Sequence, residues 1–377
     1  MNFPDELKFL EKPLSYFKVE LSQESLTRIV LWTVLFIGLV HFHAPKVDPQ
    51  LPYANEMATQ NLTPISTATS DPKYTRNDLQ ELPENSLLWV SGSSIAVKPS
   101  EESDYVFLPS QVTTNRDQYV SVKMARRMLD TYTMVKEGID RKPSAMVITL
   151  NPFWELQDTS AFFKTNLMNK GVRTWLNKDD LALIPALASP GDLLWASIGV
   201  QHNFIANGYD YLKIAQTKYK QEKPKKKKTQ QKLSYNQPTL FWMMNRYNEG
   251  KDFNAYDAKK WQAEVMANNN LTQSKWGQKL LKQMLEDIKQ SKIPTLIYVA
   301  PVDLAIERTA ARVAFRTIQG QFDLILDEYK SDQIRIIDNI PTSVQRSMKY
   351  TDYLHLSDSG RLPQLFSKEI NKLKVQP

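Results

Sequence analysis

Three polar side chains, in two distant stretches of the chain, have the types that acyl transfer by a serine nucleophile requires. Ser94 lies in 87-LLWVSGSSIAV-97, where an apolar run ends in small polar residues and then becomes apolar again. Asp352 and His355 lie near the C-terminus, in 352-DYLHLSDSG-360. A spacing of three on one turn places both side chains on the same side, so that the carboxylate can hold the imidazole in one tautomer while the other ring nitrogen faces a nucleophile. This is the arrangement that an acyl-transfer triad needs.

Each of these residues also has an ordinary structural interpretation. The serines after the apolar run are compatible with a tight turn and a helix cap, and Asp352 can cap a turn while His355 lies at the surface. Among the four histidines, His41 and His43 lie in or beside an apolar segment, and His202 has no acidic residue close in sequence. His355 is therefore the favoured general base.

The elements that must position these residues are predicted to be alternating strands and helices. Apolar runs that suit buried strands occur at 87–92, 105–109, 144–151, 294–301 and 334–338. Helical patterns occur at about 118–137, 276–290 and 305–329, and a C-terminal helix follows His355. This alternation predicts an α/β fold with a parallel sheet covered on both faces. In such sheets functional residues gather at the carboxyl ends of the strands.

The two motif stretches, 90-VSGSSIAV-97 and 352-DYLHLSDSG-360, resemble the first and last motif blocks of the SGNH (GDSL-type) hydrolase superfamily. Gly92, Ser93 and Ser94 stand where that family has Gly-Asp-Ser. The resemblance implies a flavodoxin-like three-layer parallel sheet. It also implies that Ser94 is the nucleophile, His355 the base and Asp352 its orienting partner.

The family's middle blocks, which supply the oxyanion hole, match less well. Asn151, in 146-MVITLNPFWE-155, stands at the end of the third strand and is either an oxyanion donor or a turn residue before Pro152. The second block should contain a glycine, but none occurs between Gly92 and Gly138. A backbone N–H of Ser110 or Gln111, in 106-VFLPSQV-112, is the predicted substitute, beside that of Ser94 itself.

Gly-Ser-Ser in place of Gly-Asp-Ser is similar to the membrane-anchored branch that includes D-alanyl transfer and alginate or peptidoglycan O-acetylation proteins. That resemblance implies an O-acyltransferase or acylesterase acting on a cell-envelope glycan or polyol polymer, with a membrane-bound O-acyltransferase as partner and with no cofactor. Two alternatives stay open. One is an inactive SGNH-like scaffold that docks to such a partner or to an anionic polymer, and the other is an unrelated membrane-anchored α/β protein.

The chain is predicted to have four parts. Segment 29–45 contains no Lys, Arg, Asp or Glu and predicts a single transmembrane anchor. More basic residues precede it, in 1–28, than follow it, which predicts a cytoplasmic N-terminus and an extracytoplasmic body. Segment 46–85, rich in Pro, Ser, Thr and Asn, is predicted to be a stalk, and 86–377 to be the SGNH-like domain.

A large helical insertion is expected at about 155–290, because the stretch between Asn151 and Pro294 interrupts the alternation and holds six of the eight tryptophans. It contains the basic stretch 218–232, in which Lys225, Lys226, Lys227 and Lys228 follow one another. A solvated loop is the simplest interpretation of this run; contact with anionic lipid or envelope polymer is the functional one. Nucleic-acid binding lacks any recognisable module.

The composition narrows the chemistry further. The chain has 377 residues, a net charge of +7 and no cysteine, which excludes disulfides, thiolate metal sites and cysteine nucleophiles. Two scattered histidines outside the apolar segment make a poor metal site, and we expect none. With 11 glycines and no Gly-rich fingerprint, a dinucleotide or phosphate loop is not expected either.

Overall fold

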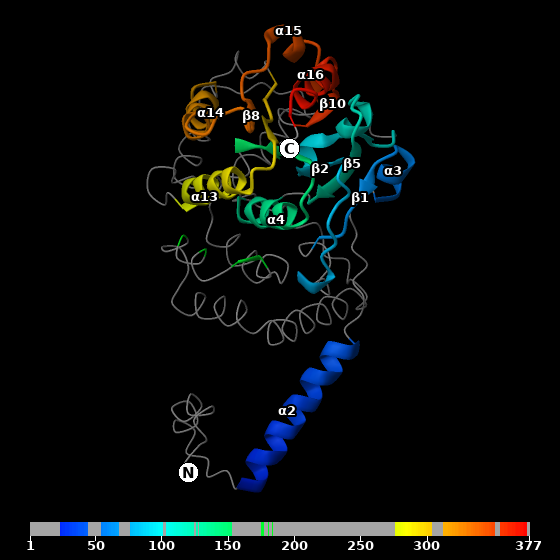
Figure 1. Cartoon of the computed structure of the whole chain (residues 1–377), viewed down its shortest axis with the longest axis vertical. Helices are drawn as coiled ribbons and strands as arrows, with labels where there is room; N and C mark the ends of the chain where they lie inside the picture. The colour runs from blue at the N-terminus through cyan, green and yellow to red at the C-terminus, as the bar shows by residue number, and fades with distance from the viewer. Residues whose placement is uncertain are drawn as a thin grey trace, which may run out of the picture.

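A parallel sheet forms the centre of the computed structural model (Figure 1). The structure describes residues 23–43, 54–67, 76–100, 103–123, 126, 128–152, 175, 176, 180, 183, 276–303, 312–350 and 355–374. Within them the sheet has six strands in the order β1-β5-β2-β6-β7-β8, and all neighbouring pairs are parallel. The strands are β1 (Thr63–Pro64), β2 (Ser86–Ser91), β5 (Asp117–Val122), β6 (Ala145–Leu150), β7 (Thr295–Val299) and β8 (Ile334–Ile337). The α/β class predicted from the sequence is thus confirmed.

Alternate side chains of the central strands supply two separate cores, one on each face of the sheet. On one face, Leu88 and Val90 of β2 pack with apolar residues of three helices, α4 (Met128–Asp140), α13 (Trp276–Ser291) and α14 (Arg312–Asp327). On the other face, Leu87 and Trp89 pack with α16 (Leu362–Ile370) and with Met57 of α3 (Ala54–Thr59). Both faces of β2 are buried, as its continuous apolar sequence requires.

Two short antiparallel pairs lie outside the main sheet. β3 (Ala96–Val97) pairs with β4 (Val106–Phe107), and β9 (Lys349–Tyr350) pairs with β10 (Leu356–Asp358). β3 follows the one-turn helix η3 (Ser93–Ile95), which itself follows β2. Another short helix, η4 (Leu108–Gln111), continues from β4, and α15 (Thr342–Gln345) lies between β8 and β9.

The predicted helix at 118–137 is wrong over residues 118–122. Residues 117–122 form β5, and the helix α4 begins only at Met128. Val120, Ser121 and Val122 are buried and pair with β2. The β-branched valines therefore pack in the sheet, although the spacing of apolar residues here also suits a helix. The predicted strand at 105–109 is correspondingly reduced to the two residues of β4, which join β3 and not the main sheet.

The predicted stalk at 46–85 is also wrong where the structure describes it. Met57 and Leu62 are buried in the core, and β1 extends the sheet beyond β5. The buried Arg141, which pairs with the buried Glu137, donates hydrogen bonds to the carbonyls of Ser66 at 2.8 Å and Gln80 at 3.4 Å. These segments therefore belong to the domain, because buried apolar and charged groups of the body have their partners there.

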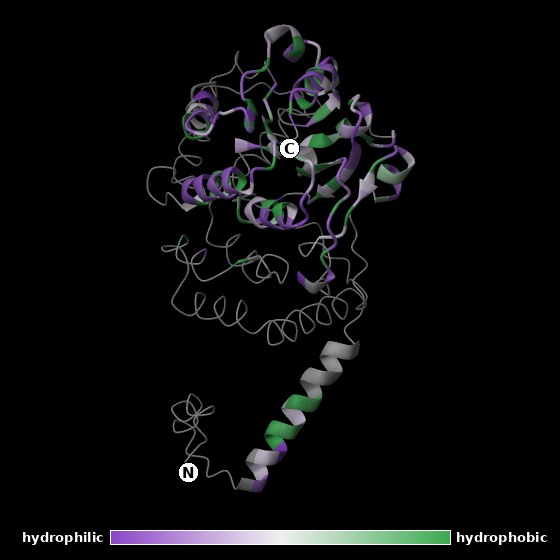
Figure 2. Ribbon diagram, in the orientation of Figure 1, coloured by the Kyte–Doolittle hydropathy of each residue, from purple (hydrophilic) through white to green (hydrophobic). Residues whose placement is uncertain are grey.

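The apolar segment predicted as a membrane anchor falls mostly within the helix α2 (Gln23–His43). Its hydrophobic middle is visible in Figure 2, and Ile29, Leu31, Trp32 and Val34 are all at least half exposed. Among the helices of the described ranges, none combines the length and apolar character that crossing a bilayer requires.

Most of the predicted insertion lies outside the described residues. This holds for His202, for the basic stretch 218–232 with its four lysines, and for most of the tryptophans. Trp175 is described and is completely buried, with the Arg76 guanidinium 5.0 Å from its ring centroid. Asp180 accepts hydrogen bonds from Tyr132 at 2.5 Å and Lys136 at 2.6 Å, which fastens this part of the chain to α4.

Candidate functional site

Ser94 lies at the point where the strand order of the sheet reverses. After β2 the chain forms β5 on one side, crosses by α4, and continues with β6 on the other side of β2. The carboxyl ends of β2 and β6 therefore flank a topological switch point, which is where open α/β sheets place their ligands. Ser94 follows β2 directly, in η3, and its side chain is half-buried.

Three hydroxyl groups meet at this switch point. Ser94 Oγ is 3.1 Å from Thr149 Oγ1, and Thr149 Oγ1 is 2.5 Å from Ser91 Oγ. Ser91 and Thr149 are fully buried at the ends of β2 and β6, and Ser91 also donates to the Gly92 carbonyl at 3.3 Å. Sequence reasoning missed Thr149, since a threonine inside an apolar strand has no distinguishing signal; only the register of β6 beside β2 brings it to Ser94.

The segment that carries His355 lies alongside the segment that follows Ser94. The Lys98 backbone N–H donates a hydrogen bond of 3.1 Å to the Leu356 carbonyl, so β10 begins beside the end of β3. His355 immediately precedes Leu356 and is half-buried. The first and last motif stretches are more than 250 residues apart in sequence. The structure brings them together beyond the carboxyl end of β2. Asp352 lies outside the described residues.

The structure also describes the other two predicted oxyanion donors, Asn151 and Ser110. Asn151 follows β6 directly, two residues after Thr149, and is half-buried. Ser110 lies in η4, and the pairing of Ala96 with Phe107 brings that segment close to the Ser94 turn. The Ser110 hydroxyl donates to the Phe107 carbonyl at 2.7 Å and to Gln60 Oε1 at 3.0 Å. The role of its backbone N–H group as an oxyanion donor stays a prediction.

A buried cation lies against the backbone just before Ser94. Arg126 is 4% exposed, and its Nε would be 3.3 Å from a Cβ built on Gly92. The backbone N–H of Lys123 donates to the Ser91 carbonyl at 3.1 Å, and the Lys123 side chain forms an ion pair with the buried Asp130. Gly92 is therefore closely packed, because a Cβ at this position would require Arg126 to move slightly.

Tyr298, in β7, is the register partner of Thr149 and lies on the same side of the sheet. Burial raises the pKa of its phenol well above the ordinary value, with the nearby Tyr350 as a second cause. Tyr298 is therefore a neutral packing residue, whose ring lies 4.9 Å from that of Phe366 in α16. Tyr298 is therefore not a candidate base, and His355 remains the general base that the sequence predicts for Ser94.

The sheet and the hydroxyl cluster define an α/β protein with a polar site at the switch point of a parallel sheet. Neither a protein-family model nor a curated protein matches the sequence. Within the described residues, no group of three or more His, Asp or Glu side chains is arranged to hold a metal ion.

Proposed function

We propose that the protein is an SGNH-type serine acyltransferase or acylesterase that acts on a cell-envelope glycan or polyol polymer. The observation that carries the proposal is the position of Ser94 at the switch point, with the His355 segment held beside it by the bond between Lys98 and Leu356. The strand order supports a flavodoxin-like sheet, because β5-β2-β6-β7-β8 follows the doubly wound order 2-1-3-4-5, with β1 added at one edge.

The proposed reaction has two half-steps. His355 takes the hydroxyl proton of Ser94 while Ser94 Oγ attacks the acyl carbonyl, and the resulting oxyanion is stabilised by Asn151 and backbone N–H groups. His355 then gives the proton to the leaving oxygen or sulfur, and the acyl-enzyme ester forms. In the second half-step His355 deprotonates an acceptor hydroxyl, or water, which attacks this ester and releases Ser94. Asp352 orients His355, as the resemblance implies, and no cofactor or metal takes part.

The source of the acyl group in this proposal is a membrane-bound O-acyltransferase. The support is the resemblance of Gly92, Ser93 and Ser94 to the membrane-anchored branch of the family. The acceptor is a polymer hydroxyl, and Lys225 to Lys228 are proposed contacts for an anionic polymer or for lipid head groups.

The proposed location, outside the cytoplasmic membrane with a cytoplasmic N-terminus, comes from the charge distribution of the sequence. Lys8, Lys12, Lys18 and Arg28 precede segment 29–45, and only Lys46 follows it before Lys73. The absence of cysteine makes a direct test simple. In intact cells an impermeant maleimide should label Asp332→Cys, at an exposed position, and should label Lys12→Cys only after permeabilisation. Protection of both positions would place the domain in the cytoplasm.

A second candidate function is a non-catalytic scaffold that docks to a membrane acyltransferase or an anionic polymer. The specific observation in its favour is that the Ser94 hydroxyl is bonded to Thr149, an arrangement that a purely structural turn residue would also show.

A serine-directed fluorophosphonate probe separates the two candidates. The full-length protein should be labelled by the probe and should hydrolyse a chromogenic acetyl ester, and Ser94→Ala should lose both activities. Ser91→Ala is the matched control, because Ser91 is a buried neighbour in the same hydroxyl cluster, and we expect it to retain labelling at a reduced rate. Labelling that survives Ser94→Ala would exclude Ser94 as the nucleophile. No labelling of a folded wild type would favour the scaffold.

A further inference from the structure

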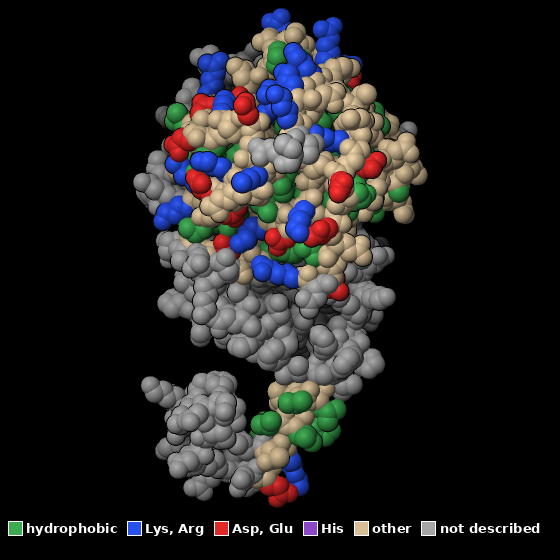
Figure 3. Space-filling view, viewed as in Figure 1, with side chains coloured by type: hydrophobic (Ala, Val, Ile, Leu, Met, Phe, Trp, Pro, Cys, Tyr) green, Lys and Arg blue, Asp and Glu red, His purple; other side chains and the backbone are tan. Residues whose placement is uncertain are grey.

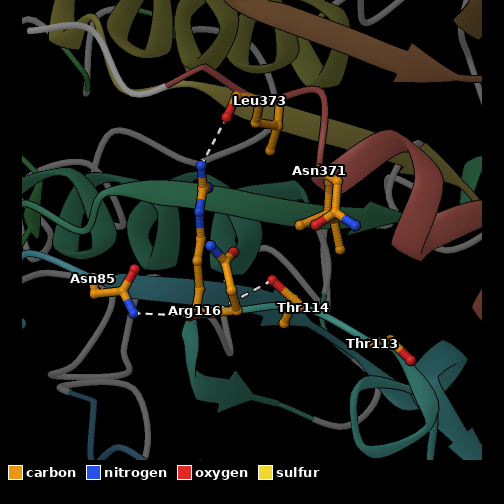
Figure 4. A pocket seen from close by; sticks show the side chains of 8 residues that line it. Asn85, Thr113, Thr114, Arg116, Asn371 and Leu373 are labelled. Atoms are coloured by element: carbon orange, nitrogen blue, oxygen red, sulfur yellow. Dashed lines mark hydrogen bonds between the residues drawn. The ribbon is translucent and has the colours of Figure 1, made fainter.

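A cavity of about 640 Å³ lies at the amino ends of β2 and β5, whereas Ser94 follows the carboxyl end of β2 (Figure 4). It is bounded by the segment 113–116 before β5, by Asn85 before β2, and by the end of α16. Its volume falls within the range of small-molecule sites, about 300–1,000 Å³. Asn85 and Gly92 lie at opposite ends of β2, so the rise of about 3.3 Å per residue separates the cavity from the Ser94 turn by about 20 Å. The cavity is thus separate from the Ser94 turn.

Most of the lining side chains are polar and neutral, and two, Ile370 and Leu373, are apolar. Asn85, Thr113, Thr114, Asn115 and Asn371 contribute amides and hydroxyls, and Arg116 contributes the one charge. None of the lining side chains is a carboxylate or an aromatic ring. Such a surface offers both donors and acceptors and has no platform on which a ring can stack.

Arg116 reaches across the cavity toward the end of α16 (Figure 4). Its Nη2 donates to the Leu373 carbonyl at 2.7 Å, while its buried Nη1 has no hydrogen-bond partner among the described residues. Burial lowers the pKa of this guanidinium, which still remains charged at neutral pH. A buried donor without a partner is costly, and a ligand oxygen that reaches it with a small movement of the side chain relieves that cost.

The rest of the lining argues against an anion as the ligand. The carbonyl end of α16, which is the negative end of its dipole, borders the cavity at Ile370, Asn371 and Leu373. These carbonyls accept hydrogen bonds and disfavour negative charge, and the guanidinium is already bonded to one of them. On the face seen in Figure 3, acidic and basic side chains are interspersed, without a broad basic field. The preferred ligand must therefore both donate and accept.

We propose that this cavity binds a neutral, hydroxyl-rich ligand, namely a sugar or polyol unit. Each hydroxyl of such a ligand donates to a carbonyl or amide oxygen of the lining and accepts from Arg116 or from an amide N–H. Binding is expected to be weak, because hydrogen bonds to neutral groups exchange for bonds to water with little net gain. The proposal does not depend on the acyl-transfer proposal.

Saturation-transfer difference NMR on the full-length protein in lipid nanodiscs tests the proposal with four probes: glycerol, glucose, N-acetylglucosamine and maltotriose. We expect saturable binding of at least one probe. Arg116→Gln and Asn371→Ala should each weaken it about three- to tenfold, as the loss of one hydrogen bond implies. Arg361→Gln is the matched control, since this exposed arginine lies at the other end of α16 and should leave binding unchanged. Tighter binding of maltotriose than of glucose would identify a polymer segment as the ligand. Equal binding of the two would identify a single sugar unit as the ligand.

Asn371→Ala keeps the test decisive even if Arg116→Gln fails to fold, because Asn371 is exposed and its side chain has no hydrogen bond among the described contacts. Absence of saturable binding by all four probes would overturn the proposal. So would binding that Asn371→Ala and folded Arg116→Gln leave unchanged, since the ligand would then occupy another place. Because the readout is binding and not acyl transfer, neither result bears on Ser94.

Discussion

Ser94 Oγ lies 3.1 Å from Thr149 Oγ1 and shares that partner with Ser91 Oγ, so three hydroxyls form a chain across the switch point. Each hydroxyl has one proton to donate. The hydroxyl protons can point along this chain in either direction. In the first, the Ser94 hydroxyl donates to Thr149 and the Ser91 hydroxyl donates to the Gly92 carbonyl. In the other, Ser91 donates to Thr149 and Thr149 donates to Ser94, which leaves the Ser94 proton for His355. The second direction is the one that the proposed chemistry uses.

Thr149→Val should therefore slow the reaction of Ser94 and also weaken the fold. Valine keeps the shape of threonine but removes the donor to Ser94 Oγ and leaves the buried Ser91 hydroxyl with only the Gly92 carbonyl. We expect the free energy of unfolding to fall by about 1–3 kcal/mol and the rate of fluorophosphonate labelling to fall about tenfold. Thr149→Ser, which keeps the hydroxyl, should retain most of the labelling. Equal labelling of the valine variant and wild type would show that the hydroxyl chain has no part in activation.

Gly92→Ala should destabilise the turn that carries Ser94. The new Cβ would be 3.3 Å from the buried Arg126 Nε and 3.5 Å from the Lys123 carbonyl oxygen, so the arginine must shift within a packed site. Overpacking of this kind costs about 1–3 kcal/mol. Gly320→Ala is the control, because nothing lies within 4 Å of the new Cβ in α14, and there alanine should stabilise the helix by about 0.5–1 kcal/mol. Thermal unfolding of the two variants should shift in opposite directions, and a shift of the same sign would contradict the packing argument.

The domain should need residues before Ser86 in order to fold. Gln60 donates to the Tyr105 carbonyl at 2.7 Å and accepts from the Phe107 N–H at 2.9 Å, and Met57 is completely buried. A fragment of residues 54–377 should unfold cooperatively near the temperature of the full chain. A fragment of residues 86–377 should be insoluble or should lack a sharp transition, because it exposes the core face beneath α3 and a sheet edge at β5. A stable 86–377 fragment would restore the stalk interpretation.

The sequence predicted the strands at 87–92, 144–151 and 294–301 because burial on both faces leaves a nearly continuous apolar run, and it predicted the strand at 334–338 from the isoleucines around Arg335. It failed for β5, where Gln118, Tyr119 and Ser121 mix polar and apolar residues in a pattern that also suits a helix. It failed at 54–67 as well, since a two-residue edge strand and a one-and-a-half-turn helix have too few residues for a period. Motif reasoning nominated Ser94 and His355, whereas the position of Thr149 beside Ser94 follows from strand register and that of Arg126 beside Gly92 from packing.

Asp323 should make the stability of the fold depend on pH. Burial in α14 raises the pKa of its carboxyl to about 6, with repulsion from Asp338 and Asp327 adding to the effect and the hydrogen bond from Gln319 opposing it. Because this folded-state pKa lies above the ordinary value of 3.8, the folded protein binds the proton more tightly than the unfolded chain does. The resulting stabilisation is complete below about pH 3.8 and is lost as the pH rises through about 6.

Asp323→Asn, which stays neutral and keeps an acceptor for Gln319, should therefore raise the unfolding temperature at pH 7.5 and raise it less at pH 5.0. The measurement is thermal unfolding of the variant and wild type at both pH values. Asp332→Asn serves as the control, since it makes the same substitution at an exposed position. An equal gain for Asp323→Asn at the two pH values would show that the Asp323 carboxyl does not titrate in this range.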